Sequence, residues 1–246
     1  MIRLQHILIF AVLLITAPSF ASELFDKGLK AANEKKYTEA AVAFEEVIEH
    51  EKFNVSAYYN LGNCYYHLRK YGKAIWAFEK VLKLNPRDAE APMSLELCYN
   101  KIGPDNSWTP HTGGFQRLIC GVGSSTWAWL SIFVSICLGL TVFTLFKLSN
   151  TPWKRLLFMS SLGEAVLLIA FVIAASSAHN YTQDDRFAIV TGKSAPTFLN
   201  DLGERSDLDL TEGTKVEIIG TTKTKLEVML HNGNKVLVSA DAVARI

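Results

Sequence analysis

The chain has 246 residues, a formal net charge of +1 and an apolar fraction of 49%. That apolar fraction excludes an intrinsically disordered chain, and the balanced charge argues against a nucleic-acid binder, which needs a basic surface. The mean hydropathy of +0.16 is high for a soluble domain. It reflects three separate apolar segments and not one evenly apolar chain.

The first apolar segment lies near the start of the chain. It covers residues 7–16, follows Arg3 and precedes the small residues Ser19 and Ala21. This order is typical of a secretory signal peptide, so we interpret residues 1–21 as one, cleaved after its last residue. The alternative is an uncleaved anchor, although the segment is short beside the ~20 residues that a membrane span needs.

The region that follows contains a repeat with a period of 34 residues. At that offset Gly28 aligns with Gly62, and Phe44 aligns with Phe78. The period and these small and aromatic positions resemble the tetratricopeptide repeat (TPR), a helix–turn–helix unit. The resemblance predicts an all-α TPR solenoid over residues 22–104, with about two and a half repeats and a last helix that acts as a cap.

Such a solenoid carries out no chemistry, and its concave face is lined mainly by the first helix of each repeat. The repeat pattern places aromatic, apolar and amide side chains on this face. They are Phe25, Leu29, Tyr59, Asn63, Tyr66, Met93 and Leu97. Side chains of these kinds suit an extended peptide or a partner helix. The alternative is that several of them pack between neighbouring helices.

Two further apolar segments follow a predicted linker, residues 105–125. Residues 126–146 contain no charged side chain, and residues 156–178 contain one. Each segment is long enough to cross a hydrocarbon layer of about 30 Å, which predicts a two-helix transmembrane hairpin. The loop between them, residues 147–155, is basic and without acids. This favours a cytoplasmic loop, with both flanking regions on the periplasmic side. The alternative is a pair of buried core helices.

Glu164 lies inside the second predicted span. A carboxylate at that depth costs about 2.5 kcal/mol or more unless it is protonated, paired or facing a partner. The helical rise places Leu138 opposite Glu164, with Thr141 one turn away. Two interpretations stay open: a hydrogen bond from Thr141, and contact with a polar group on another membrane protein.

Residues 179–246 change to short alternating runs separated by turns. The expected strands are residues 187–190, 216–219, 223–230 and 235–238, the last two joined by a turn with an Asn-Gly pair. The spacing resembles the bacterial SH3-like fold and predicts a small all-β barrel. Lys225 stands where that family has a Trp, and Val236 and Leu237 stand where it has a Gly-Trp pair, so the aromatic platform for ligand contact is largely missing. We therefore expect a structural or docking module.

The six histidines, four cysteines and the carboxylates show no metal-ligand spacing, and no glycine-rich phosphate loop is present. We therefore expect no catalytic residue, no metal site and no cofactor. Cys64 and Cys98 are one repeat apart, on neighbouring helices whose axes are about 8–10 Å apart. A disulfide needs Cα atoms within about 7 Å, so we interpret both as small packing residues.

The complete order of segments resembles the BatE family of the bacterial aerotolerance operon. Its most specific parts are residues 125–130 at the start of the first span, residues 193–196 and residues 212–216. The resemblance implies a non-enzymatic scaffold of mixed fold class in the cytoplasmic membrane. It implies assembly with Bat proteins that carry von Willebrand factor A domains, and a link to oxidative-stress tolerance or envelope integrity.

The expected partners are therefore other membrane proteins and membrane lipid, with neither nucleic acid nor a small-molecule substrate. An alternative function is a cell-wall tether, in which the SH3-like domain, residues 179–246, binds peptidoglycan.

Overall fold

The structure, a computed structural model, describes residues 20–103, 118–147, 152–200, 203–222 and 224–246. The predicted signal peptide lies outside the described residues except for its last two positions, and most of the predicted linker lies outside them as well. The contacts divide the chain into two compact units. One holds the N-terminal helices up to Val81, the helix after residue 89 and the strands; the other holds the two long apolar helices.

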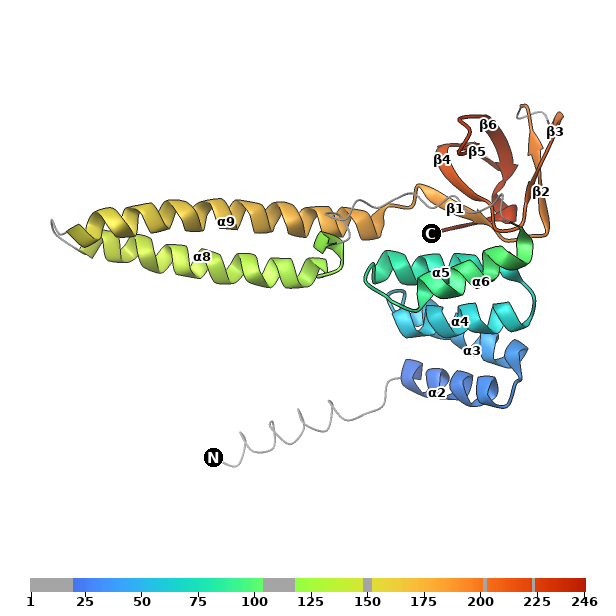
Figure 1. The fold of residues 1–246 in the computed structure, drawn as a ribbon, viewed down its shortest axis with the longest axis horizontal. Helices are drawn as coiled ribbons and strands as arrows, with labels where there is room; N and C mark the ends of the chain where they lie inside the picture. Colours follow the sequence, from blue (N-terminus) through green and yellow to red (C-terminus); the bar gives the residue numbers. More distant parts are fainter. Residues whose placement is uncertain (1–19, 104–117, 148–151, 201–202, 223) are drawn as a thin grey trace, which may run out of the picture. The chain divides into compact units, whose positions relative to one another are not determined.

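Five helices of the first unit form the TPR-like array (Figure 1). They are α2 (Phe20–Asn33), α3 (Tyr37–His50), α4 (Val55–His67), α5 (Tyr71–Leu84) and α6 (Ala91–Ile102). Helices α2 and α3 make one pair, α4 and α5 make the next, and α6 is the one helix of a third repeat that the described residues contain. The turns inside the two pairs share a backbone conformation. Lys35 and Arg69, one repeat apart, have φ values of 61° and 59°, the left-handed conformation typical of a helix C-terminus.

The helices of each pair cross with almost no space between them, as the sequence predicts. A Cβ atom at Gly28 would lie 2.8 Å from Cε1 of Phe44, and one at Gly62 would lie 2.7 Å from Cε1 of Phe78. Because interiors are close-packed, only glycine allows the first helix to rest directly on the ring of the second. Both phenylalanine rings are fully or almost fully buried.

Seven antiparallel strands follow the apolar helices. They are β1 (Phe187–Val190), β2 (Ser194–Phe198), β3 (Arg205–Thr211), β4 (Lys215–Thr221), β5 (Lys225–Met229), β6 (Lys235–Ser239) and β7 (Val243–Arg245), in the order β3-β2-β6-β5-β4-β1-β7. Strands β1, β4, β5 and β6 confirm the four expected runs. The Asn-Gly turn joins β5 to β6, with Met229 opposite Lys235 and Gly233 at a φ of 82°.

Every strand contributes to one apolar core, which requires the sheet to curl. Leu210 on β3 and Val243 on β7 belong to the same buried cluster, although these two strands are the edges of the sheet. In a flat sheet, edges six strand spacings apart would be separated by about 29 Å. The sheet therefore wraps around its core as a small β domain, in agreement with the expected mixed fold class.

The turn between β3 and β4 packs against the end of the helical array. Gly213 in this turn has a φ of 80°. A Cβ atom there would lie 2.4 Å from Cδ1 of Ile102 on α6 and 2.7 Å from Cδ1 of Ile75 on α5. Glu212 Oε1 accepts a hydrogen bond from the Gly72 N–H at 2.7 Å. This N–H lies in the first turn of α5, where it has no partner within the helix and where the helix dipole favours a carboxylate.

A buried ion pair adds to this contact. Lys215 Nζ lies 2.8 Å from Glu79 Oε2, and the two side chains are only 7% and 8% exposed. One repeat earlier, the equivalent Glu45 accepts a hydrogen bond from the hydroxyl of Tyr65. The equivalent Tyr99 hydroxyl has no hydrogen-bond partner among the described residues, while Glu79 binds Lys215. The β domain thus engages an acid whose equivalent, one repeat earlier, joins two neighbouring repeats.

The second unit contains two long apolar helices, α8 (Ser124–Lys147) and α9 (Pro152–Gln183). Both could span a membrane by length and composition, with mean hydropathies of 2.2 and 2.3 over their most apolar windows. No residue in either window is buried, which argues against the alternative of two core helices of a globular protein. Helix α9 begins at Pro152, inside the segment predicted as a loop.

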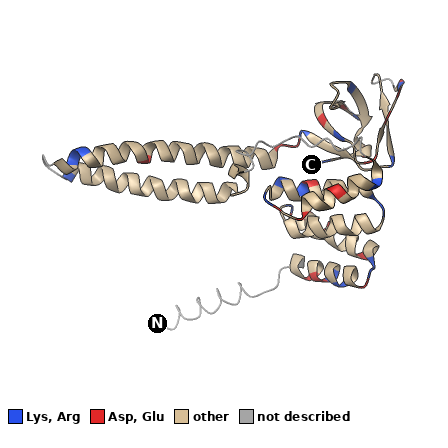
Figure 2. Cartoon of the chain, viewed as in Figure 1, with Lys and Arg blue, Asp and Glu red and all other residues tan. Residues whose placement is uncertain are grey.

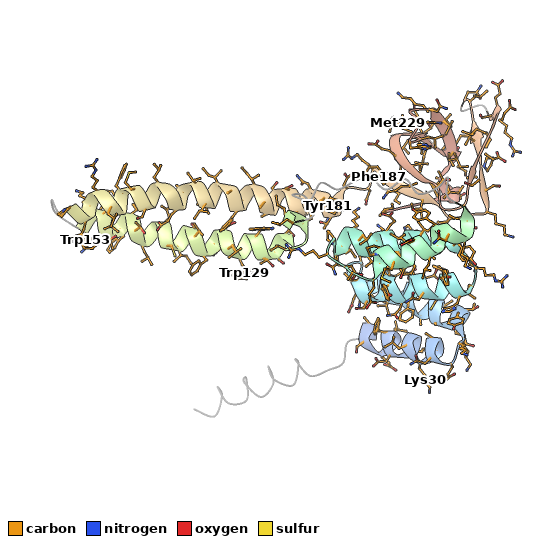
Figure 3. The ribbon with its side chains drawn as sticks, in the orientation of Figure 1. Lys30, Trp129, Trp153, Tyr181, Phe187 and Met229 are labelled. Atoms are coloured by element: carbon orange, nitrogen blue, oxygen red, sulfur yellow. The ribbon has the colours of Figure 1, made fainter. Side chains whose placement is uncertain are left out.

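The charges and aromatic residues of this helical hairpin are unevenly placed. Figure 2 shows basic residues gathered at the loop end, and the sequence of α9 contains Glu164 as its only acidic residue. In Figure 3, Trp153 lies at the loop end, whereas Trp129 and Tyr181 lie toward the other end. Tryptophan and tyrosine prefer membrane–water interfaces, so this distribution fits a hairpin with an interface at each end.

We expect Gly62→Ala to lower the free energy of unfolding by about 1–3 kcal/mol, because the added methyl group overlaps the Phe78 ring. Urea unfolding of the full chain in detergent measures the change. Gly192→Ala is the matched control, since its Cβ would meet only an ordinary contact at 3.6 Å. Combining Gly62→Ala with Phe78→Leu is expected to recover part of the loss. Equal stability of the Gly62 and Gly192 variants would contradict the close crossing.

We expect Lys215→Met to destabilise the first unit by about 3–5 kcal/mol, because Glu79 is left buried without its partner. Hydrogen exchange of α5 and of β4 in the full chain measures the effect on both sides of the contact. Removing both charges, as Glu79→Leu with Lys215→Met, is expected to restore most of the stability. Tyr99→Phe serves as the control from the same region, since it removes only an unpaired hydroxyl. Faster exchange in β4 alone would show that the array does not depend on this pair.

Candidate functional site

The candidate site is the face formed by the first helix of each repeat, α2, α4 and α6. Two rows of side chains cross these helices at the repeat spacing, and Tyr66 lies one turn beyond them on α4. The first row is Phe25, Tyr59 and Met93, and the second, one helical turn further along, is Leu29, Asn63 and Leu97. We refer to these seven residues as the A-helix face. The described structure therefore places all seven predicted side chains on the helices from which they were expected.

Exposure of the A-helix face increases toward α6. Phe25 and Tyr59 are half-buried, because each ring packs edge-on against the phenylalanine of its own helix pair, at centroid distances of 5.5 and 5.7 Å. Helix α6 has no second helix within its repeat among the described residues, and Met93 and Leu97 are 68% and 53% exposed. The Phe25 and Tyr59 rings thus pack partly between helices, as the alternative interpretation of this face predicts. Met93 and Leu97 on α6 remain accessible to a partner.

Polar groups lie in the middle of the A-helix face. Asn63 is half-buried, and in the described part of the chain its side-chain amide has no hydrogen-bond partner. An amide offers two donors and an acceptor, which are the groups that a peptide backbone can satisfy. Tyr66 is held at the edge of the face by ring contacts with Tyr71 and His67, at centroid distances of 5.7 and 5.9 Å.

Two thiols lie in the array behind this face. Cys64 and Cys98 are buried and free. Burial raises the pKa of the Cys64 thiol to about 11 and that of the Cys98 thiol to about 12. A thiol with so high a pKa is protonated at neutral pH and is a poor nucleophile. Both cysteines therefore act as small core residues. The described residues also contain no cluster of His, Cys, Asp and Glu that could hold a metal ion.

The apolar hairpin brings together the two polar residues that the sequence singled out. The Thr141 hydroxyl on α8 lies 3.2 Å from Glu164 Oε1 on α9 and 3.0 Å from the Cys137 carbonyl oxygen. A hydroxyl carries one proton, so these two acceptors compete for it. The Glu164 Oε2 atom is buried without a partner among the described residues. The expected contact with Thr141 is present, and contact with another protein stays a prediction.

Sequence reasoning misses the contact between the array and the β domain. Glu79 and Lys215 are far apart in the chain and read as ordinary charged residues. The sequence does contain one signal of this contact, which is Gly72 in the first turn of a helix. The equivalent position of the preceding repeat is Thr38. A Cβ atom at Gly72 would lie 2.5 Å from the Val190 carbonyl oxygen, so this glycine marks the close approach of another part of the chain.

The comparisons with known proteins identify the repeat. The tetratricopeptide repeat family matches residues 55–88, which contain α4 and α5. The chain is also similar to peroxisomal targeting signal receptors. It is 39% identical over 75 residues to the Candida albicans receptor, covering 30% of this chain and 13% of the receptor. It is 36% identical over 87 residues to the Debaryomyces hansenii receptor, covering 35% and 14%.

This chain spans only about one seventh of the length of these curated relatives. The likeness supports a non-catalytic repeat module that binds other proteins, and it indicates no enzyme family. The relatives are not BatE proteins, so the finer family resemblance stays a prediction.

We expect Cys64 and Cys98 to react with a maleimide at about pH 8 at least 100-fold more slowly in the folded chain than in denaturant. A pKa raised by about two units lowers the thiolate fraction by about that factor. The pKa values of both thiols are higher in the folded chain than in the unfolded chain, so the unfolded chain releases its thiol protons at a lower pH. The array therefore loses stability as the pH rises above about 9. Mass spectrometry of the labelled peptides gives the rates. Ser56→Cys, an exposed position on α4, is the control, and equal rates at all three thiols would contradict the burial.

Proposed function

We propose that the protein is a non-enzymatic, membrane-anchored scaffold whose helical array binds a polypeptide on the A-helix face. One observation carries this proposal: two rows of aromatic, apolar and amide side chains continue across three helices at a constant spacing. Exposed Met93 and Leu97 provide adaptable apolar contact, and the unpartnered amide of Asn63 is available to a peptide backbone. The repeat family and the similar receptors support an interaction module of this kind.

Anchoring in the proposal depends on the helical hairpin. Helices α8 and α9 have the length and apolar character of membrane spans, and aromatic residues lie toward both ends (Figure 3). The loop end is basic, which favours the cytoplasmic side. In this arrangement the array and the β domain both lie on the periplasmic side of the cytoplasmic membrane, in agreement with the N-terminal segment interpreted as a signal peptide.

The partner in this proposal is a protein of a Bat-type complex. Its support is the sequence resemblance to the BatE family, whose sister proteins carry von Willebrand factor A domains. The physiological role that goes with it is tolerance of oxygen or oxidative stress, or integrity of the envelope. The β domain is assigned a structural role, because its β3–β4 turn already packs on Ile75 and Ile102 of the array.

Affinity capture of the full chain from membranes in mild detergent tests the A-helix face. We expect Leu97→Glu and Met93→Glu each to lower recovery of the bound partner at least about tenfold, since a charge placed in an apolar contact costs more than 1.4 kcal/mol. These positions are better choices than Tyr59 or Tyr66, because both tyrosine rings pack against other rings of the array. Truncating them would also weaken the fold.

Val42→Glu is the matched control for this experiment. Val42 is 58% exposed on α3, a second helix of a repeat, so it lies outside the A-helix face. We expect this variant to recover the same partners as the wild type, and all variants to unfold at the same urea concentration. An unchanged set of partners in the Leu97 and Met93 variants would exclude the A-helix face as the binding surface.

A further inference from the structure

The loop end of the helical hairpin contains a cavity that the scaffold role does not use. Its volume is about 860 Å³, and it lies between the last turns of α8 and the first turns of α9. Val142, Phe146 and Phe158 contribute apolar walls, and Lys154 and Arg155 contribute the charged part of the lining. The cavity therefore combines an apolar wall with two cationic groups at the end of the hairpin where the basic residues gather (Figure 2).

The charge at this cavity is of one sign. Residues 142–163 contain Lys147, Lys154 and Arg155 and no acidic residue, and the next acid along α9 is Glu164. Glu164 lies nine residues beyond Arg155, which is about 13 Å along the helix. Glu164 lies one turn beyond the lining residue Ser161, so the acid is near the apolar end of the cavity and away from the two cationic groups.

The helix itself adds to the positive potential. Lys154 and Arg155 lie in the first turn of α9, which begins at Pro152. The first backbone N–H groups of a helix have no partner within it, and the dipole places partial positive charge there. An anion bound at this position meets two cationic side chains close to the positive end of the α9 dipole. Any apolar chains attached to that anion would lie along the walls formed by Val142, Phe146 and Phe158.

We propose that this cavity binds the headgroup phosphate of an anionic phospholipid, with Lys154 and Arg155 contacting the phosphate and the acyl chains lying against the apolar walls. The proposal rests on the proposed membrane hairpin. Basic pockets between membrane helices on the cytoplasmic side are suited to anionic headgroups. A zwitterionic lipid is a poorer ligand, because no residue that lines the cavity carries a carboxylate that could pair with its ammonium group.

Native mass spectrometry of the full chain tests this site. The protein is placed in nanodiscs of equal parts phosphatidylglycerol and phosphatidylcholine, transferred to mild detergent, and the retained lipids are counted. Each basic side chain near an anionic lipid contributes about a fivefold gain in binding. We therefore expect the wild type to retain phosphatidylglycerol about 25-fold over phosphatidylcholine, and Lys154→Gln with Arg155→Gln to abolish that preference. The charge-conserving pair Lys154→Arg with Arg155→Lys is expected to keep it.

Lys147→Gln is the matched control. Lys147 lies at the same end of the hairpin, but its ammonium group sits 5.7 Å from the Phe143 ring centroid and is not part of the cavity lining. We expect this variant to keep most of the preference. An equal loss in the Lys147 and Lys154/Arg155 variants would overturn the site, because it would show a general effect of surface charge. Displacement of the lipid by excess inorganic phosphate would also overturn it, because the site would then take a free anion.

Extraction of membranes with alkaline carbonate separates this proposal from the one on which it rests. If the wild-type protein is washed from the membrane, the membrane hairpin and the lipid site are both excluded. If the protein stays in the membrane and retains the two lipids equally, only the lipid site is excluded. Partner capture through the A-helix face is measured independently of either result.

Discussion

The contact between the β3–β4 turn and the end of the helical array determines how the first unit holds together. Its buried Lys215–Glu79 pair contributes only while both charges are present, since either charge alone is costly in that position. Gly72 allows the α5 backbone to approach the Val190 carbonyl oxygen, and Gly213 allows the β3–β4 turn to pack directly on the Ile75 and Ile102 side chains. A short array of repeats buries little surface by itself, so the β domain supplies an end contact that a further repeat would otherwise make.

The elements that the sequence predicts correctly have local signals. The array follows from a repeat period and from Gly62 opposite Phe78, and the helical hairpin follows from two long apolar segments. The β5–β6 hairpin follows from alternation around an Asn-Gly turn. Strand β2 was missed because it contains Pro196, and β3 was missed because acids at Asp207 and Asp209 interrupt its apolar residues. The residues of β2 and β3 form strands because they pair with neighbouring strands, and not because of their own composition.

The candidate face was predictable for the same reason, because positions one repeat apart occupy equivalent places on successive helices. Its gradient of exposure was not predictable. That gradient depends on which helices have a partner, so Tyr59 is partly covered by its own pair while Leu97 is open. The contact of Glu79 with Lys215 was beyond sequence reasoning, because it joins residues 136 positions apart and neither residue type is distinctive.

The position of the β domain also fixes one end of the proposed binding face. Three first helices, with axes about 8–10 Å apart, give a face about 20 Å across. An extended polypeptide advances about 3.3 Å per residue, so the face can read a segment of about six residues. A repeat inserted between α5 and α6 would lengthen the face, but it would separate Ile75 from Ile102. Gly213 could then no longer pack against both side chains. The β domain therefore fixes the A-helix face at its α6 end, and a longer face would require repeats added elsewhere in the array.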